Sequence, residues 1–268
     1  MTDFQPLIAP LFVPATRPDR IVKAARSGAD AVIVDLEDAV PALEKDHARS
    51  GLAGFVANQP VPVFVRVNAV RTQWFDSDIA FVKGNDVAGV MLPKTQSAAD
   101  IAAVGLDLPV IGLIESAIGV TSLSDICTAS NLKQLAFGSI DYALDLGCTE
   151  DRGALLLARL SIVTQSRAHN LAGPLDGVTG SISDTDLIAS DTQYAVQLGF
   201  GGKLAIHPKQ LGVVRMAMAP SEKDVAWAKA VCAANETSGG AAVLLDGRMI
   251  DAPVFAKAHQ ILKRHSYL

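Results

Sequence analysis

The chain is poor in the features that mark several common protein classes. It has three cysteines in 268 residues, and Cys127, Cys148 and Cys232 stand far apart without metal-ligand spacing, so we interpret them as reduced thiols. A net charge of -5 argues against a nucleic-acid-binding protein. No apolar run approaches the ~18 residues that a membrane span needs, and no basic segment typical of a signal peptide opens the chain. These absences favour a cytoplasmic protein that binds neither nucleic acid nor membrane.

The hydrophobic residues that are present form a repeating pattern. Half of the chain is hydrophobic, which is enough for one large core. Short apolar runs alternate with helical patterns at roughly 25 to 30 residues per unit, which predicts parallel strands with right-handed crossovers. Eight such units predict a (β/α)₈ TIM barrel of the α/β class. An open doubly wound sheet is the alternative, and we disfavour it because no Gly-x-Gly-x-x-Gly follows the first strand. The strands are expected at 7–14, 29–34, 62–67, 87–92, 110–114, 134–137, 174–178 and 203–206.

The last part of the chain does not continue the repeat. Ser221 is the expected N-cap of a helix, Asp246-Gly247 is a hairpin turn signal, and a final helix is expected near 253–264. We therefore predict a barrel over 1–219 and a C-terminal helical and hairpin extension over 220–268. The extension is either a lid on its own barrel or an arm that reaches a neighbouring subunit.

Polar residues stand where the expected strands end. In this barrel class the active site lies at the C-terminal ends of the strands. Acids outnumber bases among these residues, so some of the acids need another cation. A ring of compensating salt bridges at the barrel mouth is the alternative. The set consists of Asp35, Glu37, Asp38, Arg66, Asn68, Lys94, Glu115, Asp141, Asp176 and His207.

Two carboxylates in this set suit a metal ion. Glu115 and Asp141 are expected on consecutive strands, which are neighbours at ~5 Å spacing. Because no His or Cys is nearby, the pair favours Mg²⁺, which prefers oxygen ligands. Alternatively, one of the two carboxyls is protonated or paired with Lys94.

The basic residues have both binding and structural interpretations. The guanidinium of Arg66 suits a substrate carboxylate, and its pairing with Asp35 or Glu37 is an alternative that does not exclude this role. His207 has either a structural hydrogen bond or a catalytic role. A basic edge for a phosphate-bearing ligand, with solvated side chains as the alternative, would consist of Arg17, Arg20, Lys23 and Lys94.

Several segments form a recognisable combination when taken in order: 11–14 with Arg17-Pro18, 35–40, 65–68, 92–94, 114–116, Phe137-Gly138 with Asp141, 206–208 and 246–251. Together they resemble the citrate lyase beta-subunit-like family, which includes citryl-, malyl- and citramalyl-CoA lyases. The likeness covers nearly the whole chain, and the combination is specific although no single segment is.

The resemblance implies a (β/α)₈ barrel, usually trimeric, that binds Mg²⁺ and cleaves or forms a carbon–carbon bond in a CoA or acyl-carrier thioester. It implies that Glu115 and Asp141 are metal ligands, and that Arg66 anchors the carboxylate of a keto acid. Asp251 resembles an acid/base contributed by a neighbouring subunit, and Glu37 and Asp38 resemble support for metal-bound water. Further substrate or CoA contacts are expected at Arg17, Arg20, Lys23, Lys94, Gly138 and His207.

Three departures from the family pattern leave the substrate open. Ile140 and Gln96 stand where many members have acids, and the loop 178–181 lacks the aromatic and acidic residues often found there. The expected activity is Mg²⁺-dependent cleavage of a short 3-hydroxy acyl-CoA into an acyl-CoA and a 2-keto acid. The alternatives are a pyruvate-dependent class II aldolase acting without CoA, a thioesterase, and an inactive subunit that binds an acyl carrier.

Overall fold

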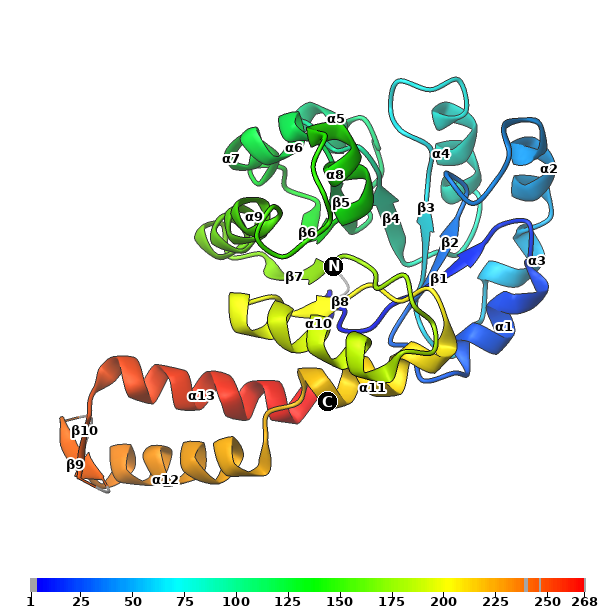
Figure 1. The fold of residues 1–268 in the computed structure, drawn as a ribbon. Coiled ribbons are helices and arrows are strands. Elements are labelled where there is room, and N and C mark those ends of the chain that lie inside the picture. The colour runs from blue at the N-terminus through cyan, green and yellow to red at the C-terminus, as the bar shows by residue number, and fades with distance from the viewer. Residues whose placement is uncertain (1–3, 239–240, 246, 268) are drawn as a thin grey trace. The chain divides into compact units, whose positions relative to one another are not determined.

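The computed structural model describes residues 4–238, 241–245 and 247–267, and the chain divides into two compact units, Met1–Val214 and Arg215–Leu268. The first unit contains an eight-stranded parallel sheet whose spatial order follows the chain from β1 to β8 (Figure 1). This order excludes the doubly wound alternative, in which the strand order reverses within the sheet. The strands are β1 (Leu11–Pro14), β2 (Val32–Asp35), β3 (Val63–Arg66), β4 (Gly89–Leu92), β5 (Val110–Ile114), β6 (Leu132–Phe137), β7 (Ala172–Asp176) and β8 (Gly202–Lys203).

Backbone hydrogen bonds join the two edges of this curled sheet. The Lys203 N–H donates to the Ile8 carbonyl at 2.8 Å, and the Phe12 N–H donates to the Ala205 carbonyl at 2.9 Å. Leu11 and Ala205 also form a parallel bridge. The α/β fold with a curled eight-stranded sheet is therefore established, and it is consistent with the predicted barrel.

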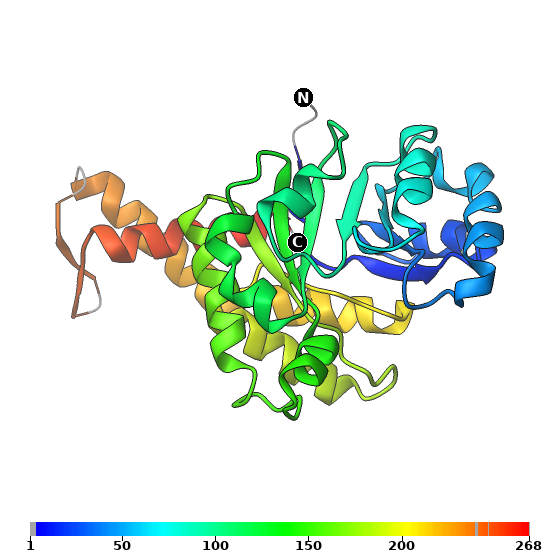
Figure 2. The ribbon, with the colours of Figure 1, turned by 90° about the horizontal axis from the view of Figure 1, so that it is seen from above.

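Helices of the first unit lie on the outer side of the sheet (Figures 1 and 2). The segments 41–57 and 116–130 each contain short helical pieces rather than one continuous helix, and the helix after residue 151 begins at Leu156. Ser97 accepts the N–H of Asp100 and is the N-cap of the helix Ala98–Ala102. The pieces are α1 (Asp19–Ala25), the 3₁₀ turn η1 (Ala42–Glu44), α2 (Lys45–Ser50), α3 (Ala53–Val56), α4 (Phe75–Lys83), α5 (Ala98–Ala102), α6 (Ala117–Thr121), α7 (Leu123–Ile126), α8 (Ser139–Leu146), α9 (Leu156–Ala168), α10 (Thr185–Leu198) and α11 (Pro208–Met218).

The strands β2, β4 and β5 are buried on both faces, which explains why they are continuous apolar runs. One face contributes Ile33, Phe64, Met91 and Ile111 to a core inside the curled sheet. Every residue of β5 is buried. At Gly89, an added Cβ would lie 2.4 Å from the Pro109 carbonyl oxygen, so this strand position admits no side chain. The sequence of the strands thus determines a tightly packed interior beneath their C-terminal ends.

The second unit is a helical hairpin that contains two short strands. Ser221 accepts the N–H of Asp224 at 3.1 Å, which confirms the predicted N-cap. Ala228, Val231, Ile250 and Phe255 form its core. The predicted turn residue Asp246 lies outside the described residues. The elements are α12 (Glu222–Ser238), β9 (Val243–Leu245), β10 (Arg248–Ile250) and α13 (Ala252–Tyr267).

Within the described ranges, no helix combines the length and the apolar character that a membrane crossing requires. The three cysteines carry free thiols.

Candidate active site

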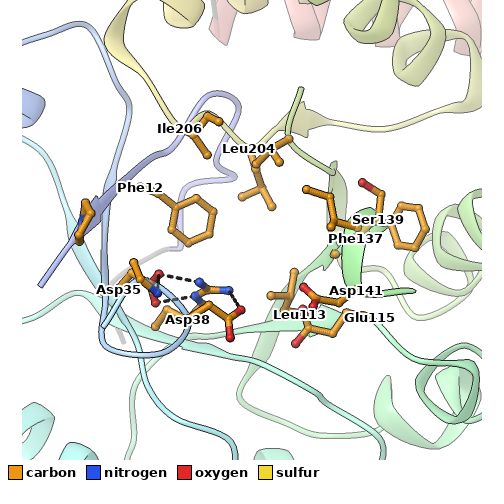
Figure 3. Close-up of a pocket in the computed structure, with 16 residues that line it drawn as sticks. Phe12, Asp35, Asp38, Leu113, Glu115, Phe137, Ser139, Asp141, Leu204 and Ile206 are labelled. Carbon is orange, nitrogen blue, oxygen red and sulfur yellow. Dashed lines mark hydrogen bonds and ion pairs between the residues drawn. The ribbon is translucent and has the colours of Figure 1, made fainter. Parts of the chain in front are cut away.

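A cavity of about 490 Å³ opens at the C-terminal ends of the strands. Leu113 and Leu204 belong both to its lining and to the interior core, so the cavity lies directly on that core. Figure 3 shows carboxylates and apolar side chains around the same space. The lining consists of Phe12, Pro14, Asp35, Asp38, Ala39, Arg66, Leu113, Glu115, Phe137, Gly138, Ser139, Ile140, Asp141, Val178, Leu204 and Ile206.

Arg66, at the end of β3, is held by carboxylates of the β2 loop. Its Nε and Nη2 donate to the two oxygens of Asp35 at 2.8 and 2.6 Å. Its Nη1 also lies 3.1 Å from Glu37 Oε2 and 3.5 Å from Asp38 Oδ2. Burial alone would lower the pKa of Arg66, but the hydrogen bond and charge of Asp35, together with Glu37 and Asp38, raise it. The alternative interpretation of Arg66, pairing with Asp35 or Glu37, is therefore confirmed.

Lys94 supports two acids at once, through its backbone and its side chain. Its N–H donates to Glu115 Oε1 at 2.7 Å, whereas its ammonium group pairs with Glu37. The backbone of Lys94 has φ +50°, a left-handed conformation that costs about 1–2 kcal/mol for a residue with a Cβ. One alternative paired Lys94 with Glu115 or Asp141. The Lys94 ammonium group pairs with Glu37 instead.

This backbone strain gives a testable result. Lys94→Gly and Lys94→Ala both remove the ammonium group, but only glycine accepts φ +50° without strain. We expect the glycine variant to be more stable than the alanine variant by about 1 kcal/mol, measured by urea unfolding. Equal stabilities would show that the left-handed conformation is not retained in solution.

Glu115 follows β5 and is almost completely buried. Its Oε2 has no hydrogen-bond partner among the described residues. Burial, and then the charge of Glu37, raise the pKa of Glu115 to about 8. A Cβ on Gly138 would lie 2.6 Å from Oε2, so the glycine provides the space that this carboxylate occupies.

Asp141 lies in the first turn of α8, which corrects the expectation that Glu115 and Asp141 lie on consecutive strands; the two acids instead follow the consecutive strands β5 and β6. The chain passes from β6 through Gly138 directly into this helix, where an acid near the N-terminus is favourable. Asp141 nevertheless lines the cavity with Glu115, and Figure 3 shows both carboxyl groups on the same side of it. Its charge also contributes to the raised pKa of Glu115.

Lys45 is a supporting residue that sequence reasoning missed. The side chain is buried, lies over the Trp74 ring at 5.0 Å, and donates to the carbonyls of Leu36 and Glu37 at 2.8 Å each. Asn68 donates to the same Leu36 carbonyl at 3.1 Å. These contacts fix the loop that carries the acids around Arg66. A lysine at the start of a helix is usually solvated, so the sequence contained no signal for this role.

The predicted basic edge does not line the cavity. Arg17 pairs with Asp19 at 2.7 Å, and its side chain is 47% exposed. Arg20 and Lys23 lie on α1, and both are exposed. Their predicted CoA contacts remain predictions.

The predicted site residues Glu37, Lys94 and His207 also lie outside the cavity lining of the first unit. His207 Nδ1 accepts the N–H of Lys209 at 3.2 Å, in line with its structural alternative. Asp251 belongs to the second unit, directly before α13, and its carbonyl accepts the Phe255 N–H at 2.9 Å.

Asp176, at the end of β7, forms salt bridges, as the alternative interpretation of the polar residues at the strand ends predicts. It accepts from Arg159 Nε at 2.9 Å and lies 3.5 Å from Lys203 Nζ. All three side chains are buried. This group therefore stabilises the sheet–helix layer beside the cavity.

The fold and the cavity define an α/β protein that gathers carboxylates over the C-terminal ends of a parallel sheet. The chain belongs to the HpcH/HpaI aldolase/citrate lyase family, which it matches over residues 9–208. The family resemblance predicted from the motifs is therefore confirmed.

Similar proteins extend this assignment over nearly the whole chain. A citrate lyase subunit beta-like protein of Deinococcus radiodurans is 34% identical, covering 96% of each chain. A (3S)-malyl-CoA thioesterase of Cereibacter sphaeroides is 30% identical over 97% of this chain and 94% of its own. The crystal structure of CitE from Mycobacterium tuberculosis in complex with magnesium, acetoacetate and coenzyme A has a TM-score of 0.87 and 33% identity, covering 97% of this chain and 98% of that one.

Proposed function

We propose that this protein is a Mg²⁺-dependent carbon–carbon lyase built on a (β/α)₈ barrel. Its substrate would be a short 3-hydroxy acyl-CoA of the citryl, malyl or citramalyl type, cleaved into an acyl-CoA and a 2-keto acid. The observation that carries the proposal is Glu115, a buried carboxylate that lies beside a second acid and has one oxygen without a hydrogen-bond partner in the described part of the chain. The similar CitE structure with magnesium and coenzyme A supports it.

The donor set fits a hard divalent cation. In and beside the cavity, the acids Asp35, Glu37, Asp38, Glu115 and Asp141 outnumber the bases Arg66 and Lys94. The two bases are engaged with Asp35, Glu37 and Asp38, and not with Glu115 or Asp141 in any ion pair found among the described residues. We therefore infer that Glu115 and Asp141 would hold Mg²⁺, with water or substrate oxygens completing its coordination.

The chain's own residues have distinct proposed roles in the cleavage. Bound Mg²⁺ would supply a Lewis acid for the oxygen that becomes the keto group. Asp251 of a neighbouring subunit would accept the hydroxyl proton as the carbon–carbon bond breaks. The electron pair of that bond would pass into the thioester enolate, and the same carboxyl group would return the proton to the enolate carbon. Arg66 orients the keto-acid carboxylate, and Glu37 and Asp38 support metal-bound water.

The proposed assembly and the CoA contacts follow from the family resemblance. We infer a homotrimer in which each Asp251 serves an adjacent site. Arg17, Arg20 and Lys23 would bind CoA phosphates, and Lys94, Gly138 and His207 would lie along the substrate path. Gly138 has the clearest structural support, because a side chain there would displace Glu115.

Hydrolysis of the thioester is the second candidate activity. It is favoured by the thioesterase relatives of Cereibacter sphaeroides at 30% identity. A class II aldolase acting on a free acid is a further alternative, since the family name includes aldolases.

One assay separates these activities. Purified protein is incubated with malyl-, citramalyl- and citryl-CoA and, separately, with the corresponding free acids, with Mg²⁺ or with EDTA, and free keto acid and free CoA thiol are measured. The lyase predicts Mg²⁺-dependent keto acid without free thiol. Free thiol without keto acid would identify a thioesterase, and turnover of only the corresponding free acids would identify an aldolase.

A further inference from the structure

One buried side-chain amide joins the loops that follow the last two strands of the sheet. Gln210 lies in the first turn of α11 and is 2% exposed. Its Oε1 accepts the N–H groups of Ile206 and His207 at 2.8 and 3.2 Å. Its Nε2 donates to the carbonyls of Thr179 and Ser181 at 2.8 and 2.9 Å.

This arrangement requires an amide. The backbone N–H groups can only donate and the backbone carbonyls can only accept, so the orientation of the Gln210 amide is fixed. A glutamate would place a carboxylate oxygen against two carbonyl oxygens. A leucine would leave four backbone groups without this partner, and each buried unpaired group is costly.

The two joined loops form part of the apolar side of the cavity. Val178, beside Thr179 in one loop, and Ile206 in the other both line it, together with Leu204. Figure 3 shows Ile206 and Leu204 on the side of the cavity away from Glu115 and Asp141. Because Val178 and Ile206 come from different loops, their spacing depends on what connects those loops.

We propose that Gln210 is a positioning residue that sets the spacing between Val178 and Ile206 and so limits the size of the acyl substituent accepted there. The inference deepens the proposed function and rests on it for the ligand, a short 3-hydroxy acyl thioester. Gln210 affects the choice of acyl substituent only through the two loops, because its own side chain does not line the cavity.

The chain offers a matched control in Gln134. This side chain is fully buried, accepts the Leu7 N–H at 3.1 Å, and donates to the Leu7 and Gly173 carbonyls at 3.0 and 2.7 Å. Leu7 precedes β1 and Gly173 lies near the start of β7, so these bonds are at the end of the strands remote from the cavity. Gln134→Leu therefore removes similar buried hydrogen bonds without altering the loops.

The experiment compares Gln210→Leu, Gln210→Glu and Gln134→Leu on thioesters with hydrogen, methyl or carboxymethyl at carbon 3. Both Gln210 variants should change the ratio of kcat/KM between these substrates about 10-fold, mainly through KM, as expected when a pocket wall moves by about one methylene. Gln134→Leu should lower the melting temperature but leave the ratio unchanged. A ratio that shifts no more in the Gln210 variants than in Gln134→Leu would overturn the proposal.

Amide hydrogen exchange tests the same connection without any substrate. The Ile206 and His207 amides should exchange at least about 10-fold faster in Gln210→Leu than in the wild type or Gln134→Leu, since this variant removes their acceptor, whereas Gln210→Glu keeps an acceptor oxygen. Unchanged exchange would overturn the positioning role. Wild-type protein inactive on every thioester would contradict the proposed function, while faster exchange would still support the connection between the loops.

Discussion

Glu115→Gln should abolish Mg²⁺-dependent turnover, lowering kcat/KM by about 1,000-fold or more, because the variant keeps the shape of the side chain but loses the charge. The same substitution should stabilise the metal-free protein. The carboxylate is 3% exposed, and its Oε2 lacks a hydrogen-bond partner among the described residues. A neutral amide in its place relieves the burial of a charge.

The stabilisation should depend on pH with a definite sign. The folded-state pKa of Glu115 is about 8, whereas an unfolded glutamate titrates near ~4.3. Wild-type stability should therefore fall relative to Glu115→Gln as pH rises from about 4.3 to 8, reaching a difference of the order of 5 kcal/mol at most. Saturating Mg²⁺ should reduce or reverse the difference, because it binds only the folded wild type.

Calorimetric melting between about pH 4.5 and pH 8.5, with Mg²⁺ and with EDTA, measures this effect. Asp141→Asn is the control, since Asp141 is only half-buried. It should lose turnover without the gain in stability. A Glu115→Gln variant that melts below the wild type in EDTA at high pH would contradict the raised pKa of Glu115, and a variant that keeps its Mg²⁺-dependent activity would contradict the metal assignment.

Asp251→Asn should lower kcat by about 100-fold, because it removes the proposed proton donor without changing the size of the side chain. Mixed oligomers of Asp251→Asn and Glu115→Gln should recover activity if sites are shared between subunits. With random mixing, about a quarter of the sites combine an intact Glu115 with an intact Asp251 from the adjacent subunit. Recovery to about that fraction, measured after coexpression of differently tagged chains, would support the shared site.

Arg66→Ala also removes a proposed site residue, but Glu115→Gln is the better variant to mix with Asp251→Asn. Removing Arg66 would leave Asp35 without its cation, and breaking a buried ion pair costs about 3–5 kcal/mol. Activity in the mixture no greater than the sum of the two variants alone would indicate that Asp251 acts within its own chain or not at all.

Much of the fold was predictable because it depends on local patterns. Apolar runs such as Val110–Ile114 are long enough to be buried on both faces, and their alternation with helices predicts a parallel sheet in chain order. Helix boundaries were less predictable. α8 was missed because its first turn, which contains Asp141, resembles the polar end of a strand when only the sequence is known.

The sequence by itself determined the acids at the strand ends, the family and the order of the strands, because each is carried by residues that are near one another in the chain. Only the tertiary structure decided which charges meet. It paired Arg66 with Asp35, directed the Lys94 ammonium to Glu37 and its N–H to Glu115, and buried Lys45 and Gln210 against loop backbones. These partnerships depend on distances between residues remote in sequence and on burial, which weakens solvation and strengthens electrostatic interactions. The residue types alone give neither these distances nor the burial of each side chain.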